Sequence, residues 1–333
     1  MDLLILNQPE VAALLPMAEC IDVMADALRA LAAGDAVVPL RTVVRLPDGH
    51  SAFAAMPATL AHPAALGVKV ITVFPGNEGT PLDSHQGAVL LFEADHGRLL
   101  AVMDASAITA IRTAAVSAVA TRALARADAA DLAILGAGVQ AATHLEAMLL
   151  ARPVARVRVW SRNADRARDF ARRAGERVPV AVEAVASAEA AVDGAAIVCT
   201  TTASREPVLR GAWLAPGAHV NAVGASVATA RELDTEAVRR ARLYVDRRES
   251  ALAEAGDFLV PRREGAIADD HIVGELGDVL LGRVPGRRAA AEVTLFKSLG
   301  LAVEDVAAAR HVHAKGVAAG AGTRVAFGGE RTA

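Results

Sequence analysis

Apolar and polar residues follow two different patterns along this chain, and the first third carries one of them. Residues 17–35, MAECIDVMADALRALAAGD, have the spacing of an amphipathic helix that ends at Gly34. Short strand-like runs follow, separated by turn residues such as Pro47-Asp48-Gly49. We therefore expect a helix followed by a largely antiparallel or mixed sheet. The strand-like runs are LRTVVRL, SAFAAM, GVKVITVF, GAVLLFE and LLAVMD.

From about residue 104 the second pattern begins, in which strands and helices alternate. A long helix rich in small residues, ASAITAIRTAAVSAVATRALA, is followed by the strand-like runs LAIL, VRVW, VPVAV, AIVCT, HVNAV and LYVD, with helical stretches among them. This alternation predicts right-handed crossovers and a doubly wound parallel sheet. It stops near residue 291, and we expect the last forty or so residues to return to the first domain.

Composition supports this α/β interpretation and narrows the classes of partner. The 333 residues are 53% hydrophobic but only 3% aromatic, so Ala, Val and Leu must build the core. A net charge of −3 without a Lys/Arg block favours neither a nucleic-acid partner nor a membrane surface. The N-terminus lacks a basic region, and no uninterrupted apolar stretch reaches about 20 residues. We expect a soluble cytoplasmic protein in which Cys20 and Cys199 are small buried hydrophobes.

A glycine turn at the first strand of the alternating region is the clearest candidate for a ligand site. Gly136, Gly138 and Ala141 follow the apolar run LAIL and open a helix. In a dinucleotide site the first glycine permits the turn, the second lets the backbone approach a pyrophosphate, and Ala141 replaces the third glycine. The phosphates would face the free N–H groups of the helix N-terminus. The alternative is a structural strand-to-helix turn.

The end of the next strand bears on which coenzyme would bind. Proteins that bind NAD usually carry Asp or Glu there, to hold the ribose hydroxyls. This chain has Ser161, Arg162 and Asn163, and none is a carboxylate. Because Arg162 could pair with a 2′-phosphate, we expect a preference for NADP(H), with NAD(H) also usable. The alternative is a solvated arginine at a strand end.

Three basic residues stand out because their neighbours in the sequence are apolar or small: Arg41 in PLRTVV, Lys69 in LGVKVITVF and Arg112 in AITAIRTAAVS. Buried cations need anionic partners or a function. If the three side chains converge, they would hold an anionic substrate such as a carboxylate. The alternative for each is a surface residue whose stem lies on apolar neighbours.

Other polar clusters carry weaker signals. Ser84-His85-Gln86 precedes a strand and would either contact the nicotinamide or form a turn. His311 and His313 are two residues apart on a helix and do not share a face, so we predict no metal site there. The sequence contains no CxxC, HExxH or GxSxG motif.

Taken together, these stretches resemble the ornithine cyclodeaminase/μ-crystallin family, closest to its μ-crystallin-like ketimine reductase branch. The resemblance runs through nearly the whole chain. It is carried by PLRTVV, VKVITVFPGN, SHQGAVLLFE, LLAVMDASAITAIRTAAVSAVAT, ILGAGVQA, NAVGAS followed by RELD, LYVD, and LFKSLGLAVED.

The resemblance implies a homodimer with a Rossmann domain inserted in a second, α+β domain. Residues 1–112 and 294–333 would form the substrate-binding and dimerisation domain, and residues 113–293 the NAD(P)-binding domain. The carboxylate-binding residues of the family fall on Arg41, Lys69 and Arg112. The cofactor contacts, with the two glycines of the turn, fall on Ser84, His85, Arg112, Thr113, Gly136, Ala137, Gly138, Val139, Gln140, Ser161, Arg162, Asn163, Thr202 and Ser298.

Two departures from the family pattern point away from diamine chemistry. Ornithine cyclodeaminases place a catalytic Asp after the NAVG strand, where this chain has Ser226, and a Glu where it has Ala54. The μ-crystallin branch carries Ser at the first position. The resemblance therefore implies reduction of a cyclic ketimine carboxylate, with Lys69, Arg112 and Ser226 in catalytic roles.

Three other activities remain open at this point. The first is an NAD(P)-dependent dehydrogenase of a linear amino acid such as alanine. The second is an ornithine cyclodeaminase, and the third is a non-catalytic binder of NADPH and a small anion.

Overall fold

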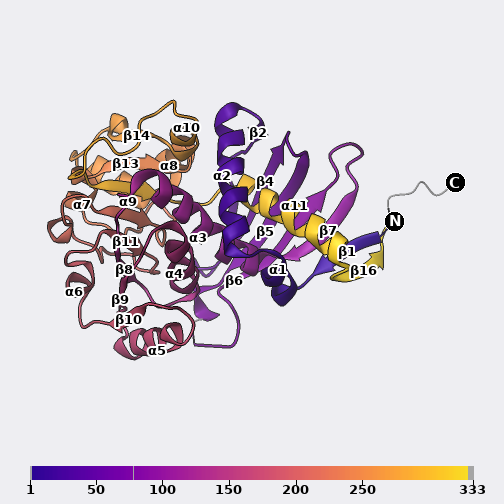
Figure 1. Ribbon diagram of the computed structural model, residues 1–333. Coiled ribbons are helices and arrows are strands. Elements are labelled where there is room, and N and C mark those ends of the chain that lie inside the picture. Colours follow the sequence, from indigo (N-terminus) through magenta and orange to yellow (C-terminus); the bar gives the residue numbers. More distant parts are fainter. Residues whose placement is uncertain (1, 78, 329–333) are drawn as a thin grey trace. The chain divides into compact units, whose positions relative to one another are not determined.

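The computed structural model describes residues 2–77 and 79–328, and the chain divides into two compact units (Figure 1). One unit is Met1–Arg112 with Leu301–Ala333, and the other is Thr113–Gly300. The chain leaves the first unit where the sequence predicted, but it returns at Leu301 rather than at residue 294. The predicted return is wrong because the segment starting at Thr294 forms a strand of the second unit.

The first unit is built on a mixed sheet, which has eight strands within the described residues. The strand order is β16-β1-β7-β6-β5-β4-β2, and β3 also pairs with β4. Only the β1–β7 pair is parallel among these neighbours, so the expected mixed sheet is confirmed. The strands are β1 (Asp2–Leu6), β2 (Ala36–Val37), β3 (Thr42–Arg45), β4 (Ala52–Leu60), β5 (Ala65–Val73), β6 (His85–Phe92), β7 (Leu99–Asp104) and β16 (Thr323–Ala326).

Helices α1 (Gln8–Leu14), α2 (Met17–Ala33) and α11 (Ala302–Ala319) belong to the same unit. Helix α2 buries one face, which includes Cys20, and ends at Gly34, whose positive φ of 88° closes the helix as expected. Helix α11 packs on α2, β4 and β5 (Figure 1). It lies so near β5 that a Cβ atom on Gly67 would come within 2.9 Å of Val306 Cγ2. This close approach brings the start of α11 against the middle of the sheet.

The second unit contains a wholly parallel sheet, in the order β10-β9-β8-β11-β12-β15-β13-β14. The strand order reverses between β8 and β11, as in a doubly wound dinucleotide-binding fold, so the expected α/β class is confirmed. Strand β15 lies between β12 and β13 and pairs with both. The strands are β8 (Asp131–Leu135), β9 (Arg156–Trp160), β10 (Ala181–Ala184), β11 (Ile197–Thr200), β12 (His219–Ala222), β13 (Arg242–Val245), β14 (Ile272–Glu275) and β15 (Thr294–Lys297).

The helices between these strands form the rest of the second unit. Helix α3 begins in the first unit and has the length and mean apolarity of a membrane span, but 78% of its most apolar window is buried inside the protein. This burial is typical of a core helix. The helices are α3 (Ala105–Leu124), α4 (Val139–Ala151), α5 (Ala164–Gly175), α6 (Ala188–Val192), α7 (Thr235–Arg240), α8 (Arg248–Glu254), α9 (Gly256–Arg263) and α10 (Leu276–Leu280).

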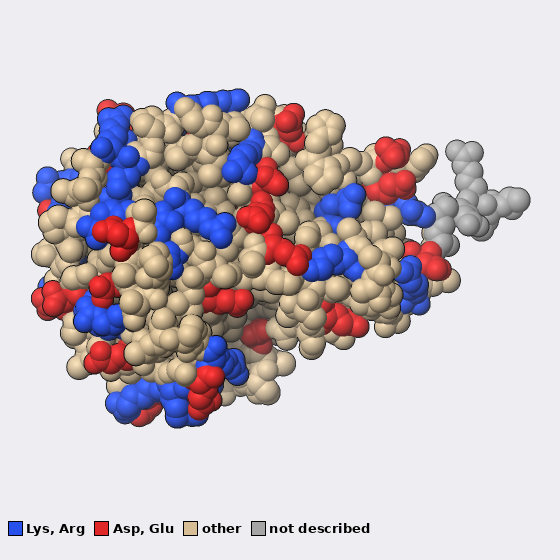
Figure 2. All heavy atoms as spheres, in the orientation of Figure 1, with Lys and Arg blue, Asp and Glu red and all other residues tan. Residues whose placement is uncertain are grey.

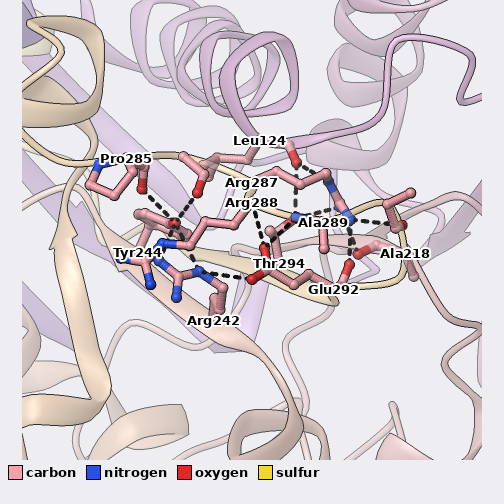
Figure 3. Close-up of polar contacts among 12 residues, drawn as sticks. Leu124, Ala218, Arg242, Tyr244, Pro285, Arg287, Arg288, Ala289, Glu292 and Thr294 are labelled. Carbon is pink, nitrogen blue, oxygen red and sulfur yellow. Dashed lines mark hydrogen bonds and ion pairs between the residues drawn. The ribbon is translucent and has the colours of Figure 1, made fainter.

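A set of polar contacts fixes the loop that leads into β15 (Figure 3). Arg287 donates to the carbonyl oxygens of Leu124 and Ala218 and to Thr294 Oγ1. Tyr244 donates to the carbonyl oxygen of Pro285 at 2.9 Å. These contacts join the loop to the end of α3 and to the beginnings of β12 and β15. Strand β15 belongs to the second unit because it pairs with β12 and β13.

The distribution of surface charges and the burial of the two cysteines are as the sequence predicted. On the face drawn in Figure 2, basic and acidic side chains lie interspersed over both units. Cys20 and Cys199 are free and buried. Burial raises the pKa of the Cys199 thiol to about 12, and it raises the pKa of Cys20 as well. Both therefore behave as small hydrophobic residues.

Candidate active site

In the second unit, the glycine turn joins the ends of two neighbouring strands. Gly136 follows β8 directly and has a φ of 128°, which other residues rarely adopt. A Cβ atom on Gly136 would lie 2.6 Å from Thr201 Oγ1, and Thr201 directly follows β11. The turn therefore sits where the strand order reverses, at the carboxyl ends of the strands. Nucleotides bind at this position in doubly wound folds.

Gly138 creates the space that a phosphate needs. It is the N-cap of α4, and a Cβ atom placed on it would meet no described atom within 4 Å. A glycine N-cap has no side chain that could accept from the first N–H groups of the helix, so these groups are left for a ligand. Ala141 is fully buried, as expected for the position that packs helix against strand. These residues fit the pyrophosphate of a dinucleotide.

The end of β9 carries the residues predicted to select the coenzyme. Ser161 is half-buried, whereas Arg162 and Asn163 are exposed. Asn163 Oδ1 accepts from the backbone N–H groups of Asp165 at 3.0 Å and Arg166 at 3.2 Å, which makes Asn163 the N-cap of α5. Asn163 therefore serves as a helix cap. Arg162 is the cationic side chain that this stretch offers for coenzyme recognition.

Glu232 ties the segments after β11 and β12 together. Its buried carboxylate accepts four hydrogen bonds, from Thr202 N at 2.6 Å and from Thr202 Oγ1, Thr200 Oγ1 and Gly224 N at 2.7 Å each. Burial raises the pKa of Glu232, while the nearby Lys297 and the threonine hydroxyls act in the opposite direction. Thr202, a predicted coenzyme contact, is thereby fixed. Sequence reasoning missed this role of Glu232, because RELD stood out only as a family motif.

Asp257 and Lys297 extend this network. Asp257 Oδ1 accepts from Glu232 N at 2.8 Å, and its Oδ2 lies 3.1 Å from Lys297 Nζ. Lys297 Nζ also donates to the carbonyl oxygen of Ala222, at the end of β12. The network therefore fixes the beginning of the loop after β12. This loop carries Ser226, an exposed residue.

Backbone contacts complete the support of this loop. Ser298, another predicted coenzyme contact, is buried and donates its N–H to the carbonyl oxygen of Ala222 at 3.0 Å. Asp246 Oδ2 accepts from the N–H groups of Leu299 at 2.5 Å and Gly300 at 2.8 Å. Burial raises the pKa of Asp246, and these backbone donors oppose that effect. These hydrogen bonds therefore fix the segment that follows β15, as the Glu232 network fixes the one that follows β12.

In the first unit, two of the three predicted cations meet at one buried carboxylate. Lys69 Nζ, from β5, lies 2.7 Å from Asp305 Oδ2, and Arg112 Nε, from α3, lies 2.9 Å from Asp305 Oδ1. Arg112 Nη1 also lies 2.8 Å from Glu304 Oε2. Lys69 is 1% exposed and Arg112 4% exposed, and both carboxylates are fully buried. The cluster contains two positive and two negative groups.

From the sequence, burial of Lys69 and Arg112 implied either an anionic partner or a function. In the structure, Glu304 and Asp305 are the anionic partners. Their role as a substrate clamp remains a prediction. The sequence contained a signal for the two carboxylates, because Glu304 and Asp305 stand side by side among apolar residues in LAVEDVAAA. Two buried acids in the first turn of an apolar helix need partners just as buried cations do.

Arg41 lies near the same part of the sheet. It directly precedes β3, whose Thr42 pairs with Ala55 of β4, while Met56 of β4 pairs with Lys69. Two strand spacings, about 10 Å, therefore separate the Arg41 and Lys69 backbones. Ala54, where cyclodeaminases carry Glu, is buried in β4 and offers no carboxylate.

Ser84 and His85 lie at the start of β6. Ser84 Oγ is 3.0 Å from His85 Nδ1, and the carbonyl oxygen of His85 accepts from Ser106 Oγ. Desolvation of the ring and the charge of Lys69 lower the pKa of His85, although the residue as a whole is exposed. Thr113, also a predicted coenzyme contact, is buried at the first position of the second unit.

His311, one of the two histidines weighed as a metal site, has another partner. Its Nε2 lies 2.8 Å from Glu19 Oε2. Within residues 2–77 and 79–328, no three His, Cys, Asp or Glu side chains are grouped so that they could hold a metal ion.

Comparison with known proteins decides the family. The model of the ornithine cyclodeaminase/mu-crystallin family matches residues 1–320. This chain belongs to that family. The resemblance inferred from the motifs is therefore confirmed, and the match extends through both units.

Three relatives show which members of the family this chain is similar to. The ketimine reductase mu-crystallin of Mus musculus is 45% identical over 280 residues, which are 84% of this chain and 85% of the relative. The structure of Thermococcus litoralis delta(1)-pyrroline-2-carboxylate reductase with NADH and L-proline has a TM-score of 0.95 and 38% identity, covering 97% of this chain and 100% of the other. An archaeal alanine dehydrogenase dimer with bound NAD has a TM-score of 0.93 and 31% identity, covering 98% and 100%.

Proposed function

We propose that this member of the ornithine cyclodeaminase/mu-crystallin family is an NAD(P)H-dependent reductase. Its substrates would be cyclic ketimine carboxylates of the pyrroline-2-carboxylate and piperideine-2-carboxylate type, and its products cyclic L-amino acids. The observation that carries the proposal is the pair Ala54 and Ser226, which stand where cyclodeaminases have carboxylates. The names of the relatives support it, since two are reductases of C=N bonds.

In this proposal, the first unit holds the substrate carboxylate. Arg41, Lys69 and Arg112 together with Glu304 and Asp305 leave one net positive charge, which suits a monocarboxylate. Fixing the imine carbon relative to the coenzyme lowers the barrier by about 7–11 kcal/mol in well-oriented reactions. The bound coenzyme supplies the hydride.

The imine nitrogen must receive a proton for the hydride to add to its carbon. Ser226, or a water that it holds, would place that proton. A hydroxyl relays a proton but is a poor acid near neutral pH, so Ser226 acts by position. Lys69 would hold the carboxylate and polarise the imine.

The coenzyme preference is a separate part of the proposal. The two structures compared above contain NADH or NAD, which supports a nicotinamide coenzyme. For this chain we propose a preference for NADP(H), because Ser161, Arg162 and Asn163 bring a cation and no carboxylate to the end of β9. Arg162 would pair with the 2′-phosphate.

We further propose that the protein acts as a homodimer. Strand β4 alternates buried and exposed side chains, and Phe53 on the exposed face pairs with Val44 of β3, which is also exposed. Exposed apolar residues on one sheet are typical of an interaction surface. The alanine dehydrogenase is described as a dimer. Light scattering after gel filtration should give a dimer for the parent and a monomer for Phe53→Glu.

A screen of NADPH oxidation tests the activity. Pyrroline-2-carboxylate and piperideine-2-carboxylate should be reduced, and pyruvate with ammonia should be a poor substrate. The similarity to alanine dehydrogenase favours that linear reaction as the second candidate, so its efficient turnover would replace the first. Conversion of ornithine to proline would indicate a cyclodeaminase. Tight NADPH binding without oxidation of any substrate would indicate a non-catalytic binder.

A further inference from the structure

The buried cluster of the first unit contains one carboxylate shared by two cations. The two oxygens of Asp305 face different partners, with Oδ2 at 2.7 Å from Lys69 Nζ and Oδ1 at 2.9 Å from Arg112 Nε. Glu304 contacts the same guanidinium through Nη1. Asp305 therefore sets the separation of the two cations, and both acids together fix the plane of the guanidinium.

We propose that Asp305 is a positioning residue that holds the Lys69 ammonium and the Arg112 guanidinium in the arrangement that receives the substrate carboxylate. The proposal rests on the proposed function, in which these cations bind the imine carboxylate. It adds a residue that acts through its contacts with the clamp. The close packing of α11 on β5 at Gly67 supports it, because this packing places the start of the helix, with Asp305, directly against β5.

Asp305 also maintains the charge of Lys69. Burial lowers the pKa of Lys69 to about 8, and the charge of Arg112 contributes to this lowering, whereas Asp305 and Glu304 act to raise it. The charged and titratable groups around Lys69 come from three elements: Asp305 and Glu304 from α11, Arg112 from α3, and His85 from β6. Cys20 of α2 faces Arg112 and Glu304 as a neutral thiol, since burial raises its pKa. Without the Asp305 carboxylate, Lys69 would lie beside the positive charge of Arg112 with less negative charge nearby to oppose the lowering of its pKa.

Asp305→Asn and Glu304→Gln form a matched pair of variants. The two acids are adjacent on one helix, both are fully buried, and both contact Arg112. Asp305 also forms an ion pair with Lys69. A loss that comes merely from breaking a buried ion pair should appear in both variants. An effect on Lys69 should be large in Asp305→Asn alone.

The chain allows a direct measurement of Lys69, because it contains only three lysines: Lys69, Lys297 and Lys315. Protein labelled with [ε-¹³C]lysine should give three resonances in an NMR pH titration, and Lys69→Met assigns the one of interest. In Asp305→Asn the Lys69 midpoint should fall by about 1–3 pH units, the usual effect of a neighbouring opposite charge. In Glu304→Gln it should move by less than half of that shift. Equal shifts in the two variants, or none in Asp305→Asn, would overturn the proposal.

Steady-state kinetics provide a second test of the proposal. The alkaline limb of kcat/KM for pyrroline-2-carboxylate should move to lower pH in Asp305→Asn by the same interval, and Asp305→Glu should restore much of it. If the parent reduces no imine, the proposed function fails, while the NMR titration still tests the link between Asp305 and Lys69. If the parent is active and the two profiles coincide, the positioning role fails alone.

If Asp305→Asn does not fold, the parent protein still decides the question. Addition of L-proline with NADP⁺ should shift the Lys69 resonance and leave that of Lys315, which pairs with Glu19, unchanged. An unchanged Lys69 resonance at saturating proline would show that the cluster does not receive the carboxylate, and the proposal would be abandoned.

Discussion

Gly136 and Thr201 come so close that a Cβ atom on the glycine would lie 2.6 Å from the threonine Oγ1. The contact joins the ends of β8 and β11, the two strands between which the strand order reverses. Gly136 therefore has two reasons to be glycine: its φ of 128° and the absence of room for a side chain. Both follow from the same turn that would present a pyrophosphate to α4.

Gly136→Ala should weaken both the fold and the binding of NADPH. The positive φ alone costs about 1–3 kcal/mol for a residue with a side chain, and the clash with Thr201 adds to this. Urea denaturation should therefore show a loss of at least about 2 kcal/mol, and fluorescence titration should show a large rise in the Kd for NADPH.

Gly138→Ala is the matched control for this prediction. Its φ is not positive and the added Cβ meets no described atom within 4 Å, so the stability should change little. The Kd for NADPH should rise, because the methyl group would occupy the space expected for the pyrophosphate. Unchanged binding in Gly138→Ala would argue against a coenzyme at this turn.

Arg162→Ala should change the preference between coenzymes. A charge-assisted hydrogen bond contributes about 1.5–3 kcal/mol, so kcat/KM with NADPH should fall by about tenfold or more. The value with NADH should stay within about threefold. Arg168→Ala is the control, since Arg168 lies on the helix α5 that follows and pairs with Asp165. A parent enzyme that uses NADH better than NADPH would already contradict the predicted preference.

Arg41→Ala should raise the KM for the imine by about 10–100-fold, because a cation that binds a carboxylate contributes about 1.5–3 kcal/mol. Arg41 lies just before β3 and Arg45 ends the same strand. Arg45 is exposed, and Arg45→Ala should leave KM unchanged. Steady-state kinetics at fixed NADPH distinguish the two. Equal KM values in both variants would remove Arg41 from the clamp.

The strands and helices of the second unit could be predicted because their signals are local. A buried parallel strand is a short apolar run, and most runs here are followed by a turn and a helix. The glycine turn added a second local signal at Gly136 and Gly138. The family motifs then connected the two halves of the first unit, which no periodicity could have joined.

The partners of the buried charges could not be predicted in the same way. Lys69 and Asp305 are far apart in the sequence and meet because α11 packs on β5. Strand β15 was misassigned for a related reason, since its neighbours β12 and β13 come from different parts of the chain. Local patterns show that a charge is buried, but tertiary packing determines what it meets.

Glu232→Ala should destabilise the second unit strongly. The carboxylate accepts four hydrogen bonds, and removing it leaves one buried and three partly buried donors without their acceptor. Each unsatisfied buried donor costs about 1–3 kcal/mol, so a total loss of about 3 kcal/mol or more is expected in urea denaturation. Glu232→Gln keeps the shape and one acceptor oxygen and should lose less. A loss below about 1 kcal/mol in Glu232→Ala would mean that water replaces the carboxylate.

Two buried histidines should make the fold sensitive to mild acid. Burial lowers the pKa of His144 to about 4 and that of His219 to about 3, while both titrate near 6.5 when unfolded. Below pH 6.5 the unfolded chain binds protons that the folded protein does not, so stability falls as the pH falls. Each pKa unit corresponds to about 1.4 kcal/mol, which gives a loss of about 2 kcal/mol for each histidine between pH 7.5 and pH 5.

Urea denaturation at a series of pH values measures this slope. The double variant His144→Gln/His219→Gln should be less stable at pH 7.5 but should lose about 4 kcal/mol less than the parent on going to pH 5. Glu232 and Asp246, whose raised pKa values act in the opposite direction, are present in both proteins, so the difference isolates the histidines. The same slope in both proteins would show that the acid sensitivity arises elsewhere, because only the two imidazoles differ.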